Sequence, residues 1–152
     1  MKFNTVTDGD LINREKWSDF VFSHPQGSVF QTPEYFFAFH GLEDDFSECV
    51  ALLDDANEIL GLVVAIIHKE GKGPKGFFSR RAIVMGSPLV KENDENLMDQ
   101  LLSALNFHLS KRVIYTQFRN MFDMERYRCI FNKNGYTYEE HLDILIDLKK
   151  SE

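Results

Sequence analysis

Hydrophobic and polar positions follow two different periods along the chain. In its middle, two apolar runs at 48–53 and 59–68 flank the polar cluster 54–58, a pattern typical of a β-hairpin. A third apolar run, 77–85, ends at a Gly-Ser-Pro break. We expect these three strands to form an antiparallel meander.

After this meander the apolar residues recur about every 3.6 positions, which predicts a helix that begins at Asn93 or Asp94. A strand is predicted next, at 113–118. Because a helix connects the strands at 77–85 and 113–118, these two strands are expected to be parallel neighbours. The apolar face of the helix is made of Leu97, Leu101, Leu102, Leu105 and Leu109.

The first thirty residues carry shorter signals. A strand is predicted at 2–6, and Asp10 or Asn13 is a suitable N-cap for the helix that follows. A Pro-Gln-Gly sequence at 25–27 ends this helix. Its apolar face is formed by Trp17, Phe20 and Val21.

The segment 28–40 combines a strand signal with a helix start. Val29–Gln31 is predicted to be a short strand, and Thr32 is the N-cap of a helix with Pro33 at its first position and Glu34 in its first turn. The helix is apolar around much of its circumference, so we expect it to be largely buried. Its aromatic residues are Tyr35, Phe36, Phe37 and Phe39.

The C-terminal part predicts one more helix, at 123–132, which ends at Asn134-Gly135, and a final β segment at 136–148. Together these elements predict one α/β domain spanning 1–152. Its central mixed sheet has about six to seven strands, an antiparallel meander plus a parallel crossover, and about four helices flank it.

Composition and charge narrow the class of protein. Hydrophobic residues make up 43% of the chain and the formal net charge is −7, which fits a packed core and argues against stable nucleic-acid binding by this domain alone. Cys49 and Cys129 have no metal-ligand spacing and are expected to be free thiols in a reducing compartment. With no apolar leader and no run long enough to span a bilayer, we expect a cytoplasmic protein without a transmembrane segment.

Seven polar residues are candidates for substrate binding. Gln31 and Tyr35 lie at the turn into the aromatic helix. Arg80 and Arg81 are adjacent and point to opposite faces of a strand, so one of them is expected to reach a cleft as an anion ligand. Three more share one face at the carboxyl end of a central strand, where open α/β sheets place ligands. The last three are Tyr115, Gln117 and Arg119.

Arg119 and two further features, the tract 71–76 and the segment 139–141, have plainer alternatives. The alternative for Arg119 is an ion pair with Asp123 or Glu125 that starts the next helix. The glycine-lysine tract 71–76 precedes a strand, which favours a hairpin tip over a phosphate loop. The five histidines form no metal-binding pattern, so no metal is expected. Glu139-Glu140-His141 offers a general base, but solvated side chains are the simpler interpretation, and no catalytic residue is assigned.

Read together, five segments of the chain resemble the fold of the Gcn5-related N-acetyltransferase (GNAT) superfamily. More closely, they resemble the N-terminal half of FemAB-type aminoacyltransferases, which build peptidoglycan interpeptide bridges. The segments are GSVFQTPEY at 27–35, ALLDDANEILGLVVAII at 51–67, SRRAIVMGSPLV at 79–90, VIYTQFRNMFD at 113–123 and NGYTYEEHLDILIDL at 134–148.

The resemblance implies transfer of an acyl or aminoacyl group to an amine of a peptidoglycan or cell-envelope precursor, with a second GNAT-like domain as a possible partner. The acyl donor is left unknown. The acetyl-CoA enzymes carry a glycine-rich diphosphate loop where this chain reads GSPLVKENDEN, at 86–96, so acetyl-CoA is a doubtful donor. FemAB-like enzymes often have a substrate-binding lysine where this chain has Phe39-His40. A catalytically silent binding or assembly module and a divergent acetyl-CoA N-acetyltransferase are the alternatives.

Overall fold

The computed structural model describes residues 2–71, 73, 76 and 78–140. Six strands form one sheet: β1 (Asn4–Val6), β2 (Asp45–Leu53), β3 (Ile59–His68), β4 (Arg81–Met85), β5 (Leu89–Val90) and β6 (Tyr115–Arg119). The α-helices are α1 (Arg14–Ser23), α2 (Pro33–Phe39), α4 (Glu95–Leu109) and α5 (Arg128–Lys133). Short 3₁₀ helices lie at Gly9–Leu11, Val29–Gln31, Lys91–Asn93 and Glu125–Tyr127.

The sheet has the predicted mixed topology. Its strand order is β1-β2-β3-β4-β6, and β5 pairs with β3 after the chain leaves β4. The pairs β2–β3 and β3–β4 are antiparallel, whereas β4 and β6 are parallel, with Arg81 opposite Tyr115 and Met85 opposite Arg119. The antiparallel meander and the parallel crossover are therefore both confirmed.

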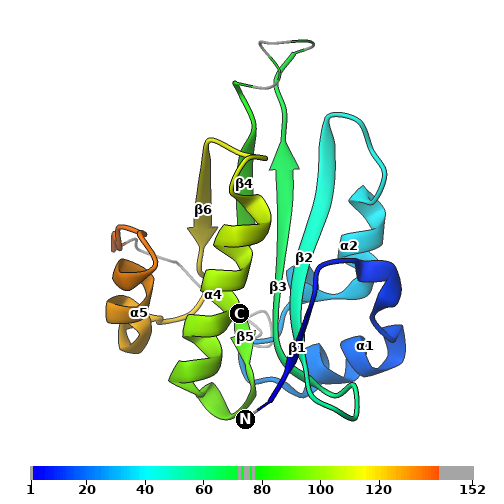
Figure 1. The fold of residues 1–152 in the computed structure, drawn as a ribbon, viewed down its shortest axis with the longest axis vertical. Coiled ribbons are helices and arrows are strands. Elements are labelled where there is room, and N and C mark those ends of the chain that lie inside the picture. The colour runs from blue at the N-terminus through cyan, green and yellow to red at the C-terminus, as the bar shows by residue number, and fades with distance from the viewer. Residues whose placement is uncertain (1, 72, 74–75, 77, 141–152) are drawn as a thin grey trace, which may run out of the picture.

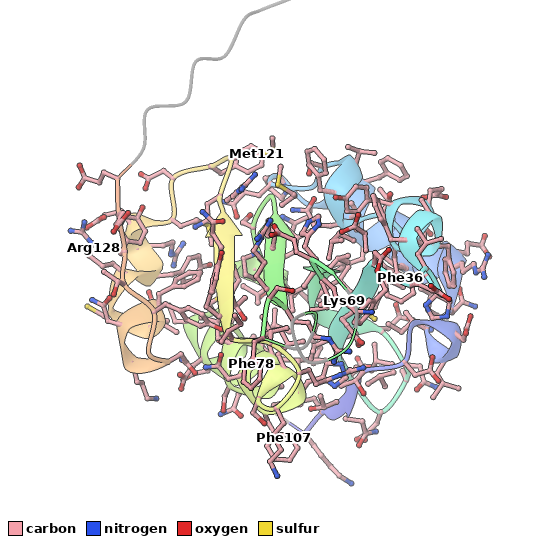
Figure 2. The ribbon with its side chains drawn as sticks, turned by 90° about the horizontal axis from the view of Figure 1, so that it is seen from above. Phe36, Lys69, Phe78, Phe107, Met121 and Arg128 are labelled. Atoms are coloured by element: carbon pink, nitrogen blue, oxygen red, sulfur yellow. The ribbon has the colours of Figure 1, made fainter. Side chains whose placement is uncertain are left out.

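Helices cover the two faces of the sheet unequally. In Figure 1, α4 crosses the near face while α1 and α2 lie beside and behind β2 and β3. Figure 2, seen from above, places Phe107 of α4 and Phe36 of α2 on different sides of the strands. One apolar cluster packs α4 and Phe131 of α5 against Val63, Ala82 and other inward side chains, and a second packs α1 and α2 against the opposite face.

Local capping explains where the helices begin. Asn13, Thr32 and Asp94 each accept a hydrogen bond from a backbone N–H in the first turn of α1, α2 and α4. Thr32 and Pro33 occupy the predicted positions. The five predicted leucines of α4 are all buried.

The structure corrects the prediction at several elements. Val29–Gln31 is a 3₁₀ helix and not a strand, because Ser28 and Gln31 bond to each other across one turn. The third strand is shorter than predicted and begins at Arg81, and the predicted helix at 123–132 is divided between a 3₁₀ turn and α5. In α2 only Pro33 and Phe36 are buried, so that helix is half-exposed and not largely buried.

The predicted final β segment lies mostly outside the described residues. Its first part, 136–140, has no strand pairing, and 141–148 is not described. Among the described residues, no helix is long and apolar enough to cross a membrane.

Both cysteines are free, but their environments differ. Cys49 is fully buried in β2, and burial, assisted by the charge of Glu48, raises the pKa of its thiol to about 12. Cys129 is exposed.

Because the thiolate is the reactive form, we expect the folded protein to consume one equivalent of DTNB and to consume the second only after unfolding in guanidinium. A folded Cys129→Ser variant should consume none, and equal rates for the two thiols would contradict this assignment.

Candidate functional site

One face of β4 and β6 is left uncovered by the helices. Ala82 and Val84 belong to the cluster under α4, so their neighbours Arg81, Ile83 and Met85 point to the other side of the sheet. The parallel register brings three side chains of β6 to the same side, and all three are exposed. We call this surface the open face. Arg81, Met85, Tyr115, Gln117 and Arg119 are at least partly exposed on it, and Ile83 between them is buried.

The open face unites three predicted site residues of β6 with one of the two arginines. Arg119 donates a long hydrogen bond of 3.5 Å from Nη2 to Gln117 Oε1. No ion pair within the described residues joins Arg119 to Asp123 or Glu125, and Asp123 Oδ1 instead accepts from the backbone N–H of Glu125. Arg119 is therefore directed along the sheet surface and not toward the next helix.

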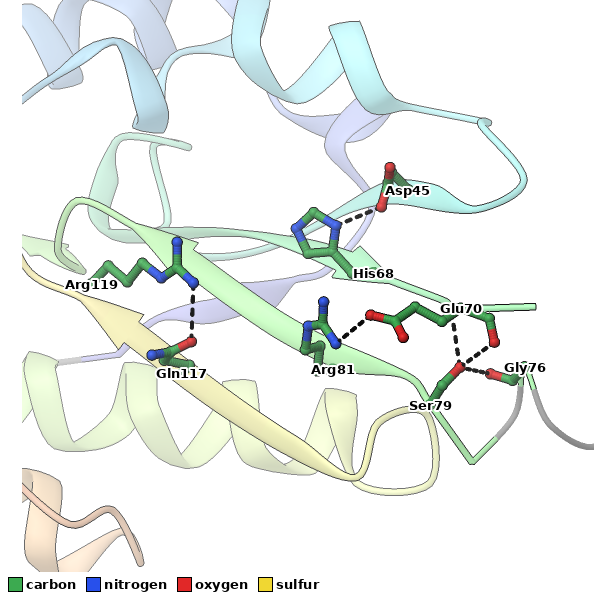
Figure 3. Close-up of polar contacts among 8 residues, drawn as sticks. All are labelled: Asp45, His68, Glu70, Gly76, Ser79, Arg81, Gln117 and Arg119. Atoms are coloured by element: carbon green, nitrogen blue, oxygen red, sulfur yellow. Dashed lines mark hydrogen bonds and ion pairs between the residues drawn. The ribbon is translucent and has the colours of Figure 1, made fainter.

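The two arginines before and at the start of β4 lie in different settings. Arg81 forms an ion pair with Glu70, with 2.8 Å between Nη1 and Oε1, on the open face (Figure 3). Arg80 precedes the strand, and its backbone carbonyl accepts from the N–H of Ile114. Arg81 lies on the open face, and the orientation of the Arg80 side chain relative to it stays a prediction.

Gln31 is buried and its side chain is used inside the fold. Its Oε1 accepts from the Ser28 backbone N–H at 2.8 Å and from Ser28 Oγ at 2.6 Å, and its Nε2 donates to the Ser87 carbonyl at 3.0 Å. Gly86 makes this contact possible, since its φ is +78° and a Cβ there would lie 2.6 Å from Gln31 Nε2. Gln31 therefore ties the turn before α2 to the end of β4.

Tyr35 is half-buried on α2 between two aromatic rings. Its ring lies 5.3 Å from that of Phe30 and 5.3 Å from that of Phe39. Burial raises the pKa of its phenol. The structure places Tyr35 on the helix beside the sheet. Gln31 lies on the turn before that helix and contacts the Ser87 carbonyl, next to Gly86, whose N–H donates to the Arg119 carbonyl. The role of both residues in binding stays a prediction.

Two polar atoms that sequence reasoning missed lie where β4 and β6 diverge. The Gly86 N–H donates to the Arg119 carbonyl at 3.0 Å, and the next residues are Ser87 and Asn120. Ser87 Oγ and Asn120 Oδ1 are both buried without a hydrogen-bond partner among the described residues. Buried polar atoms are nearly always paired, so this point of the sheet is suited to a polar ligand group.

The connection from β5 to α4 is crowded with carboxylates. Asp94 Oδ1 accepts from the N–H groups of Asn96 and Leu97, at 2.7 and 3.1 Å. Glu92 has a φ of +55° beside this cap, and Glu95 in the first turn lies 3.7 Å from Arg126. Tyr127 lies nearby, and its pKa is raised by burial, partly offset by the charge of Arg126.

No protein-family model matches the chain, and no curated protein matches it in sequence. Solved structures do match in fold. Glucosamine-6-phosphate N-acetyltransferase from Arabidopsis thaliana superposes with a TM-score of 0.66 at 14% identity, covering 97% of this chain and 100% of that one.

Two further structures agree. AAC(6')-Iy, in complex with the bisubstrate analogue CoA-S-monomethyl-acetylneamine, gives a TM-score of 0.64 at 10% identity, covering 97% of this chain and 99% of that one. Ribosomal-protein-alanine N-acetyltransferase from Brucella melitensis gives 0.57 at 14% identity, covering 96% and 100%. The chain therefore has the fold of these N-acetyltransferases.

The α4 N-terminus does not fit the cofactor that this fold implies. A CoA diphosphate would need free N–H groups at the start of the helix and a surrounding without negative charge. Here Asp94 Oδ1 already accepts hydrogen bonds from two of those N–H groups, and the carboxylates of Glu92 and Glu95 flank Asp94 in the sequence. The residues present would repel a diphosphate, and no step through CoA is derived. Among the described residues no group of side chains is arranged to bind a metal.

Proposed function

We propose that this chain is an N-acyltransferase domain of the FemAB type, which transfers an acyl or aminoacyl group to an amine of a peptidoglycan or cell-envelope precursor. The observation that carries the proposal is the pair of unpartnered polar atoms, on Ser87 and Asn120, at the point where β4 and β6 diverge. They adjoin the open face and its Arg119 and Gln117. The GNAT fold and the likeness to FemAB sequences support the same reaction class.

Positioning and electrostatics suffice for amide formation of this kind. An amine must be held against an activated carbonyl, and the oxyanion that develops must be stabilised by preorganised donors. On the open face, the Arg119 guanidinium is exposed and presents several N–H donors to an anionic substrate group. The carboxylates around α4 disfavour a CoA donor, and the class of the acyl donor is left open.

A thermal-shift experiment tests this proposal. We expect a UDP-linked muropeptide at about 100 times its Kd to raise Tm by roughly 5–10 °C, because ligand binding at that excess adds about 2.7 kcal/mol of stability. Acetyl-CoA and CoA should give no shift. Arg119→Ala should lose most of the muropeptide shift, whereas Lys111→Ala, an exposed change at the end of α4, should retain it.

Each contrary outcome points to a different function. A shift of several degrees with CoA would replace this proposal by a divergent acetyl-CoA N-acetyltransferase. No shift with any compound would favour a silent binding or assembly module that needs a partner domain. One observation favours the silent module: the carboxamide of Gln31, a predicted substrate ligand, is engaged within the fold by Ser28 and Ser87.

A further inference from the structure

A groove lies between β1 and α4, on the side of the sheet away from the open face. Within the described residues, β1 is an edge strand that pairs only with β2. The volume of the groove is about 640 Å³, within the range of about 300–1,000 Å³ that small-molecule sites occupy. One wall is a strand face and the other is a helical stripe. The strand face carries Phe3, Thr5 and Thr7, and the stripe runs along α4 from Gln100 to His108.

Two phenylalanine rings give the groove its apolar surface. Phe3 is half-buried, and together with Ala104 it packs against the core cluster under α4. Phe107 is 85% exposed, more than any other large apolar side chain in the described part of the chain. It lies on the side of the sheet opposite Phe36 (Figure 2). Phenyl rings have an electron-rich face that attracts polarised C–H groups, so the groove offers a ligand a surface for its own apolar side.

The polar side chains of the groove are mostly uncharged and make few contacts of their own. None of the described residues that line it is Asp, Glu, Lys or Arg, although the chain contains 24 acidic and 17 basic residues of these types. Four hydroxyl or carboxamide side chains in the groove make no hydrogen bond to the described residues, and such groups both donate and accept. The groove therefore suits an uncharged ligand with many hydroxyl groups. The four are Thr5, Thr7, Gln100 and Ser103.

A buried carboxylate fixes the imidazole at the end of the helical stripe. His108 Nε2 lies 2.7 Å from Glu48 Oε2, and Arg112 Nη2 lies 2.6 Å from Glu48 Oε1. The Glu48 side chain is only 11% exposed. Arg112 Nη1 lies 3.0 Å from Nε2, so both neighbours use the same ring nitrogen. His108 Nδ1 makes no hydrogen bond to the described residues, and a hydroxyl group can donate to it or accept from it in either protonation state of the ring.

We propose that this groove binds an uncharged saccharide. One side of a sugar ring presents C–H groups, which fit the rings of Phe3 and Phe107, and its hydroxyls both donate and accept, as the polar side chains of the groove do. A charged ligand is disfavoured, because a charge removed from water needs a partner that the walls do not supply. A peptide added to the sheet edge is disfavoured because β1 is three residues long. The site is separate from the open face and does not rest on the proposed function.

NMR titration of the full ¹⁵N-labelled chain with cellobiose, maltose and di-N-acetylchitobiose tests this proposal. We expect at least one of these neutral disaccharides to shift the amide signals of Thr5, Thr7 and Ser103 saturably, with a Kd on the order of 1 mM. Phe107→Ala should weaken binding at least about tenfold, and Gln100→Ala about threefold to tenfold. Both side chains are exposed, so both variants should fold.

Phe22→Ala is the matched control, because Phe22 is 76% exposed on α1, outside the groove. It should bind the sugar as the wild type does, and so should Arg119→Ala, which makes this test independent of the muropeptide test. No saturable shift with any of the three disaccharides at about 100 times that Kd would overturn the proposal. It would also be overturned by sugar-induced shifts confined to Gln117 and Arg119, or by groove signals that follow protein concentration and not sugar, which would indicate a contact between two copies of the chain.

Discussion

Replacing Trp17 with alanine is expected to lower the free energy of unfolding by about 3–5 kcal/mol and Tm by roughly 10 °C. Trp17 is fully buried between α1, α2 and the sheet, and its ring lies 5.4 Å from that of Phe36. Its Nε1 also donates to the Gln31 carbonyl at 2.6 Å. The substitution removes the largest side chain of this cluster and leaves a buried carbonyl without its donor.

Circular dichroism during thermal and urea unfolding measures this effect, since Trp17 is the single tryptophan and the variant has no indole fluorescence. Trp17→Phe is the matched control: it keeps most of the packing and loses the hydrogen bond, so it should cost only about 1–3 kcal/mol. A loss below about 1 kcal/mol in Trp17→Ala would show that α1 and α2 are not packed on the sheet as described.

The elements predicted most accurately from the sequence are those marked by one strong pattern of apolar and polar residues. The hairpin 48–68 has two apolar runs around a turn cluster, and its strands are buried on both faces. The α4 helix has an apolar stripe of period 3.6 and an Asp94 cap, so both its face and its start were readable. The parallel pairing of β4 and β6 followed from the helix between them, because a helical crossover returns the chain in the same direction.

Val29–Gln31 shows where local reasoning failed. Its apolar residues resemble a strand, but Val29 is exposed and the turn is closed by Ser28 and by the side chain of Gln31. The bond that fixes Gln31 goes to the Ser87 carbonyl, 56 positions away. A contact of that separation leaves no periodic signal in the sequence.

The sequence predicted the candidate site only where its residues lie on a single strand. Alternation along one strand gave the shared face of Tyr115, Gln117 and Arg119, and the structure bears out that arrangement. The groove between β1 and α4 escaped notice because it depends on how the helix packs beside the edge strand, which the pattern of neither element fixes. The unpartnered atoms of Ser87 and Asn120 likewise require two strands to be placed together.

Gln31→Ala is expected to lower the free energy of unfolding by about 2–4 kcal/mol without abolishing ligand binding. The change removes every hydrogen bond of a side chain that is 1% exposed. It leaves the Ser28 N–H and the Ser87 carbonyl without their partner, and each unsatisfied buried group costs about 1–3 kcal/mol. Urea unfolding measures the stability, and the muropeptide thermal shift measured on the same variant reports binding.

The control for this experiment is Gln26→Ala, five residues earlier. Gln26 is held through its backbone N–H, which donates to His24 Nδ1. Its side-chain substitution should therefore change stability by less than about 0.5 kcal/mol. If Gln31→Ala instead cost under about 1 kcal/mol and lost the muropeptide shift, Gln31 would be a ligand of the substrate, as its position in the sequence first indicated. A large loss of stability with the shift retained would establish that its role is to join the α2 turn to the end of β4.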